Sequence, residues 1–170
     1  MPTLTDVHAP PETRPGGWTR HQPWVATALR VGLAAVALAA GLSKIGDLPA
    51  SVRSVRAYEL LPEALAVVVG NGLPMVEILL GVLLLLGLFT RVAVAVFGAL
   101  MVVFTIGIAS AWSRGLAIDC GCFSPGGPTE PDQTAYPQEI ARDIAFLAAA
   151  AVLARRPRSR YSLDHRLDLH

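Results

Sequence analysis

The chain is poor in charged residues and very poor in cysteine. Asp, Glu, Lys and Arg make up 16% of its 170 residues, whereas a soluble domain carries about 25%. Lys44 is the only lysine, and Cys120 and Cys122 are the only cysteines. Two thiolates with no histidine or methionine nearby give poor support for a zinc site, so we predict no metal ligands of that kind. The net charge of +1 offers no reason to expect a nucleic-acid partner.

The sequence contains long apolar runs with few or no charged residues. Residues 73–89 contain one ionisable side chain, Glu77, and residues 92–112 contain none. About 20 consecutive apolar residues are enough to cross a lipid bilayer as a helix. We therefore predict an all-α integral membrane protein, a bundle of four transmembrane helices. The expected spans are residues 24–45, 63–89, 92–112 and 138–154.

The segments between and before these spans carry their own signals. Residues 1–23 are polar and rich in proline, which is typical of a disordered tail. A cleaved signal peptide is the alternative for residues 24–45, although this stretch exceeds the usual apolar core of about 7–15 residues. In the connector, Asp47 as a cap and Pro49 in a first turn predict a short helix lying at the membrane interface.

Basic residues set the expected orientation. The tail at residues 155–170 begins with an arginine cluster, and such clusters mark the cytoplasmic side. Four spans then place both termini in the cytoplasm and the proline- and glycine-rich loop 113–137 outside. Four basic residues count against this assignment, namely Lys44, Arg53, Arg56 and Arg114. We expect a multi-pass protein of a bacterial cytoplasmic membrane, with the bilayer as its surroundings.

The two cysteines lie in that loop and are separated by Gly121 alone. A disulfide between them closes a very small ring, so it adds little stability by restricting the unfolded chain. It also needs a tightly turned backbone, which Gly121 tolerates. Strained disulfides are exchanged readily. The spacing therefore favours a redox pair, and we predict Cys120 and Cys122 as the catalytic residues of a thiol–disulfide oxidoreductase.

Two other functions are compatible with the sequence. Thiolates are soft ligands, so a Cys-x-Cys pair could handle Cu(I). A non-redox membrane scaffold or small-molecule carrier is the third possibility; it would depend on Glu77 and not on the cysteines.

Ionisable residues inside the spans are candidates for supporting roles, because a buried charge in a membrane is costly. Glu77 serves either as a structural clamp between helices or in proton or quinone handling. Arg30 either extends back to the interface or faces a partner in the bundle. Lys44 and Arg142 lie near the outer ends of their spans, where either could lower a cysteine pKa.

Asp119 directly precedes the cysteine pair. Its carboxylate would oppose ionisation of Cys120 or serve as a proton acceptor.

Five short stretches together resemble the methylamine utilisation protein MauE family within the DoxX-like membrane superfamily. They combine an intramembrane glutamate, a Thr-Arg turn between two spans and a Cys-Gly-Cys loop. The stretches are residues 41–45, 73–81, 87–91, 119–123 and 142–144.

The resemblance implies a four-helix membrane protein that serves disulfide chemistry in exported proteins. Cys120 and Cys122 would be the exchange pair. The supporting positions would be Lys44, Glu77 and Arg142, with Asp143 beside it. The implied partner is an extracytoplasmic thioredoxin-fold or DsbA-like protein. Membrane disulfide generators of the DsbB type use two cysteine pairs and a quinone. With one pair here, a membrane quinone is the candidate electron acceptor, or the protein is one carrier in a longer chain.

Overall fold

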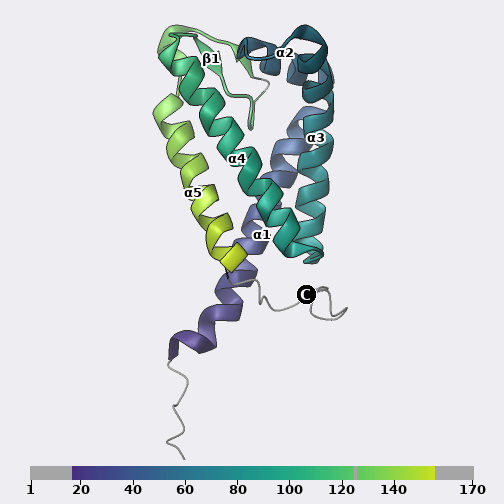
Figure 1. The fold of residues 1–170 in the computed structure, drawn as a ribbon, viewed down its shortest axis with the longest axis vertical. Coiled ribbons are helices and arrows are strands. Elements are labelled where there is room, and N and C mark those ends of the chain that lie inside the picture. The colour runs from purple at the N-terminus through teal and green to yellow at the C-terminus, as the bar shows by residue number, and fades with distance from the viewer. Residues whose placement is uncertain (1–16, 125, 156–170) are drawn as a thin grey trace, which may run out of the picture.

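The computed structural model describes residues 17–124 and 126–155. Most of this part of the chain is helical, and a loop with a short two-stranded hairpin lies at one end of the helices (Figure 1). Residues 1–16 of the tail expected at 1–23, and the basic tail beyond residue 155, lie outside the described residues. The elements are α1 (Gly17–Ile45), α2 (Leu48–Ala57), α3 (Glu63–Leu86), α4 (Thr90–Ser113), β1 (Ile118–Asp119), β2 (Gly127–Pro128), a 3-10 helix (Pro131–Gln133) and α5 (Tyr136–Arg155).

Within the described residues, three helices are long and apolar enough to cross a membrane, and they overlap the first three predicted spans. These stretches are Trp24–Ile45, Glu63–Leu86 and Thr90–Ser113. The prediction of an all-α membrane protein is thereby confirmed. Helix α5 has 20 residues, but Glu139, Arg142 and Asp143 in its first half make it more polar than the other three.

Some helix boundaries differ from those expected. Helix α1 begins at Gly17, so it extends into the segment predicted to be disordered. The predicted boundary at residue 24 was set where the apolar run begins. The backbone hydrogen bonds of a helix do not require apolar side chains, so the helix starts earlier. Helix α3 continues through Pro74. The turn expected at Thr90 and Arg91 lies earlier, because Gly87 adopts a left-handed conformation with φ 65°, which ends the helix as a glycine typically does.

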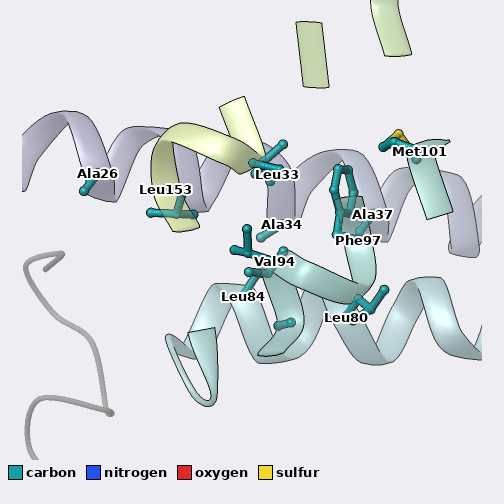
Figure 2. Packing of buried hydrophobic residues seen from close by; sticks show 12 residues of the cluster. Ala26, Leu33, Ala34, Ala37, Leu80, Leu84, Val94, Phe97, Met101 and Leu153 are labelled. Atoms are coloured by element: carbon teal, nitrogen blue, oxygen red, sulfur yellow. The ribbon is translucent and has the colours of Figure 1, made fainter. Parts of the chain in front are cut away.

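The helices associate mainly as two pairs, α1 with α3 and α4 with α5. Figure 2 shows where the pairs meet: small residues of α1 such as Ala34 and Ala37 lie against Leu84 of α3 and Phe97 of α4. Helices α1 and α3 approach each other closely. A Cβ atom on Gly41 would lie 2.6 Å from Ile78 Cγ1 and 2.8 Å from the Pro74 carbonyl oxygen.

Two buried cations tie α1 to α3. Lys44 Nζ donates to both carboxylate oxygens of Glu77 at 2.8 Å, and the two side chains are only 8% and 6% exposed. At the other half of the bundle, Arg30 Nη1 donates to the carbonyls of Leu84 and Leu85 at 2.8 and 3.0 Å. These carbonyls belong to the last turn of α3, where helices leave acceptors unpaired. Arg30 therefore faces a partner in the bundle.

The Lys44–Glu77 pair leads to a test of what holds α1 on α3. Glu77→Gln leaves Lys44 as a buried charge without a counter-charge, which should lower the free energy of unfolding by about 3–5 kcal/mol. Replacing both residues by Met removes both charges and should cost much less. Chemical unfolding in detergent micelles measures both effects. A Glu77→Gln protein as stable as the parent would contradict this account.

Candidate functional site

The cysteines occupy the tip of a short hairpin that is fastened at its base. Strands β1 and β2 pair antiparallel, with Ile118 opposite Pro128 and Asp119 opposite Gly127. Two-residue strands are too short to hold a hairpin alone. Tyr136, the first residue of α5, provides the anchor: its hydroxyl accepts from the Ile118 backbone N–H at 3.0 Å and donates to the Leu116 carbonyl.

Helix α2 lies at the same end of the bundle as the hairpin (Figure 1), and the hairpin tip packs against it. Asp47 caps α2 by accepting from the Ala50 backbone N–H at 2.9 Å, as the sequence predicted. Gly121 has φ +71°, and a Cβ atom there would lie 3.0 Å from Ser54 Oγ. Tyr58, which caps the far end of α2, donates from its hydroxyl to the Cys120 carbonyl at 3.2 Å. The left-handed backbone and the close approach of Ser54 therefore both favour glycine at position 121.

Two donors are directed at the sulfur of Cys120. Arg142 Nη2 donates to Cys120 Sγ at 3.7 Å, and the backbone N–H of Cys122 donates to it at 3.4 Å. Both cysteines are free thiols and partly exposed. Asp119 has a different role: its Oδ1 accepts from the Gly121 N–H at 2.8 Å and from the Ser124 hydroxyl, so it shapes the loop tip.

The guanidinium of Arg142 is held on two further sides. Its Nε and Nη2 donate to Asp143 Oδ1 at 3.2 and 3.1 Å, and Asp143 is only 2% exposed. The guanidinium carbon lies 5.1 Å from the centre of the Phe123 ring, within the range of a cation–π interaction. Arg142 thus links a buried carboxylate to the sulfur of Cys120.

These contacts make the two thiols unequal. The hydrogen bond from the Cys122 side chain, together with the Cys122 backbone N–H and Arg142, lowers the pKa of Cys120 despite its burial. The same hydrogen bond, together with burial, raises the pKa of Cys122. Cys120 therefore loses its proton more readily than Cys122. A thiolate is the nucleophile in disulfide exchange, so Cys120 is the more reactive sulfur.

The structure brings most of the predicted site residues together. Asp119, Cys120, Cys122, Arg142 and Asp143 form one cluster at the hairpin. Of the two cations proposed to act on a cysteine, Arg142 does so.

Lys44 instead directs its Nζ to Glu77. Glu77 shares a cavity with Cys122. Arg30 bonds to the opposite end of α3 and takes no part in the cluster.

Sequence reasoning missed four residues that complete the site, namely Ser54, Tyr58, Tyr136 and Glu139. The two tyrosines and Ser54 act through tertiary contacts that no spacing pattern signals. Glu139 is 9% exposed, and its position one turn before Arg142 was the available clue. Its carboxylate, that of Asp119 and Cys120 Sγ lie within 4.8 Å of one another, so these three could hold a cation; Arg142 already brings positive charge there.

Below the hairpin, a cavity lies between the two helix pairs. Apolar and aromatic side chains make up most of its wall, and the thiol of Cys122 and the side chains of Arg142, Asp143 and Glu77 also line it. The remaining lining residues are Val36, Ala37, Ala40, Leu80, Phe97, Leu100, Met101, Phe104, Phe123 and Phe146.

The fold and the site together define a multi-pass helical membrane protein that presents an asymmetric thiol pair at one end of its bundle. The profile of the family described as Methylamine utilisation protein MauE matches residues 22–156, and the chain belongs to that family. The motif resemblance predicted this family. Membership of the wider DoxX-like superfamily stays a prediction.

One curated relative, Methylamine utilization protein MauE of Paracoccus denitrificans, is 38% identical over 106 residues. The aligned region covers 62% of this chain and 57% of the relative, so the chain spans less than two thirds of the relative's length. No solved structure matches.

The contact between Arg142 and Cys120 predicts a pH effect. Arg142→Gln removes a charged donor from the thiolate, so the pKa of Cys120 should rise. The alkylation of Cys120 by iodoacetamide should then need a higher pH and be several-fold slower at neutral pH. Mass spectrometry that resolves the two cysteines measures the rate against pH.

Arg53→Gln is the matched control, since Arg53 lies on α2 at the same end of the bundle and pairs with Asp47 at 3.7 Å. This variant should leave the profile unchanged. A midpoint that stays in place or moves to lower pH in Arg142→Gln would refute the role given to Arg142.

Proposed function

We propose that the protein exchanges thiol and disulfide equivalents with a partner of the thioredoxin-fold or DsbA-like class outside the cytoplasm. The observation that carries this proposal is the hydrogen bond from Arg142 Nη2 to Cys120 Sγ at 3.7 Å. A cation directed at one of two neighbouring thiols is the arrangement that stabilises a reactive thiolate.

The exchange proceeds through a mixed disulfide. When the pair is oxidised, a thiolate of the partner attacks Cys120 Sγ, and the bond between Cys120 and Cys122 breaks. Cys122 leaves as a thiolate and takes up a proton. The second thiol of the partner, once deprotonated, attacks its own sulfur in the mixed disulfide and releases Cys120 as a thiolate, which Arg142 stabilises. The partner gains a disulfide, and Cys120 and Cys122 end as a dithiol. The reverse sequence reduces the partner.

The loop geometry is consistent with this role. Exchange requires each sulfur in turn to accept attack, and both cysteines are partly exposed. Cys-Gly-Cys closes a small ring, and the left-handed backbone at Gly121 lets the chain turn tightly between the sulfurs. Tyr58, at the end of α2, donates to the Cys120 carbonyl, and Ser54 of α2 lies close to Gly121; these contacts keep Cys120 beside Arg142.

The proposed topology places four spans in the membrane, with α5 as the fourth. The ion pair between Arg142 and Asp143 at 3.1 Å compensates two of the three charges that make α5 more polar. Helix α2 then lies at the outer interface, with Arg53 and Arg56 exposed. The arginine cluster after α5 keeps both termini cytoplasmic, and the hairpin faces the oxidising side, where disulfides persist.

The family name supplies a context. The Paracoccus relative is named for methylamine utilisation. For this chain we propose a corresponding role in the formation or maturation of disulfides in exported proteins.

A trapping experiment tests the exchange. Cys122→Ser leaves the Cys120 thiolate without its resolving thiol, so a mixed disulfide with the partner should accumulate. Cys120→Ser should trap far less, because it removes the sulfur to which Arg142 donates. Membranes quenched with acid, alkylated and run on non-reducing gels show the adducts, and mass spectrometry identifies the partner.

The variant that lacks both cysteines is the control and should form no adduct. The proposal fails if Cys122→Ser forms no more adduct than this control, or if the double variant supports disulfide formation in exported proteins as well as the parent does.

A further inference from the structure

The exchange site has a second face that the reaction with a soluble partner does not use. Cys122 lines the cavity between the helix pairs, whereas Cys120 is not among the described residues around it. Cys120 instead lies against Arg142 and the loop backbone. The pair therefore joins two environments, with one sulfur in the polar hairpin and the other at the end of an apolar cavity.

The electrons that the pair collects must leave it by some route. In relay systems a second cysteine pair takes them, but the sequence contains no third cysteine. The acceptor must therefore react with Cys120 or Cys122 directly. Since the cavity at Cys122 lies among the membrane-spanning helices, an acceptor that arrives from the lipid phase fits its position.

The wall of the cavity has the character of a site for a flat, apolar ring. Phe97, Phe104 and Phe146 contribute aromatic faces, and such faces favour stacked or edge-on contacts with a ring. Polar groups converge at the Cys122 end, as is typical of ligand sites in proteins. One of these groups, the Asp143 carboxylate, belongs to a residue that is only 2% exposed. Its Oδ2 atom is buried and has no hydrogen-bond partner among the described residues.

We infer that this cavity admits a lipid-soluble quinone, which takes two electrons from the Cys120–Cys122 dithiol. The inference rests on the proposed exchange for the source of those electrons. The S–S bond forms as the quinone becomes a quinol. The quinol takes up two protons: one comes from the Cys122 thiol, and the other from the Cys120 thiol or, where Cys120 is ionised, from solvent. Asp143 is placed to pass a proton, and Arg142 to donate a hydrogen bond to a quinone oxygen.

Entry of the ring requires movement of the helices. The free space in the cavity is about 20 Å³, enough for one water molecule, which needs about 10–15 Å³. The contact between the two helix pairs is less extensive than the contact within either pair, so the seam between the pairs is the place that can open. Quinone access should therefore depend on the side chains that line this seam.

The experiment uses the full chain, reduced and placed in lipid nanodiscs, with a ring-substituted benzoquinone that carries one isoprene unit. Quinol formation is followed by absorbance, and the remaining thiols are counted. We expect one quinol per cysteine pair. Leu100→Trp and Phe146→Trp fill the cavity and should slow quinol formation by about tenfold or more, since small misplacements of reacting groups have effects of this size.

Each variant has a control on the same helix that faces away from the cavity. Val103 of α4 is 62% exposed and Ile144 of α5 is 54% exposed, and Val103→Trp and Ile144→Trp should react at the parental rate. Oxidation of all four variants by a small aromatic disulfide reports whether the fold and the pair are intact, and it should be unchanged.

Two results would overturn the inference. The first is a parent protein whose thiols persist with quinone while the small disulfide oxidises them. The second is equal quinol formation in the cavity-filling and control variants, which would mean that the quinone reacts from solution. If quinone oxidises the pair at the cavity but Cys122→Ser traps no partner, the inference stands and only the proposed exchange fails.

Discussion

A buried charge in a membrane-spanning bundle needs a partner, because no water is present to solvate it. Two buried cations, Arg30 and Lys44, satisfy this requirement, and the part-buried Arg142 also has partners. Arg30 bonds to carbonyls at the end of α3, Lys44 to a carboxylate on the same helix, and Arg142 to a neighbour on its own helix and to a sulfur atom. The first two fix α1 against α3. The third leaves part of its donor capacity for chemistry.

That difference explains why the reactive group is at the hairpin. Glu77 accepts two hydrogen bonds from Lys44, so the charge of Lys44 is neutralised by Glu77 and is not directed at a cysteine. Arg142 is shared between Asp143 and Cys120, so its charge also acts on the sulfur. Hydrogen bonds of Tyr136, at the start of α5, and Tyr58, at the end of α2, hold the hairpin in place. The asymmetry between the thiols therefore depends on the docking of a loop between two helices that are distant in sequence.

The sequence was sufficient where the signal is local. Apolar runs predicted α1, α3 and α4, Asp47 and Pro49 predicted α2, and Gly121 predicted the tight turn. It failed where several placements satisfy the same pattern. Lys44 and Arg142 were equal candidates for a cysteine neighbour, since helix rise gives height in the membrane but not the direction of a side chain. Tyr58 and Tyr136 act only through tertiary hydrogen bonds, and the turn at Gly87 depends on one left-handed residue.

The central claim is that Cys120 and Cys122 form a reversible disulfide on the outer face of the membrane. Labelling of intact cells with a membrane-impermeant maleimide, before and after mild reduction, measures this most directly. The account predicts little labelling before reduction and labelling of both cysteines afterwards, without permeabilisation of the cells. Cysteines that react only after permeabilisation, or that react fully without reduction under every growth condition, would contradict it.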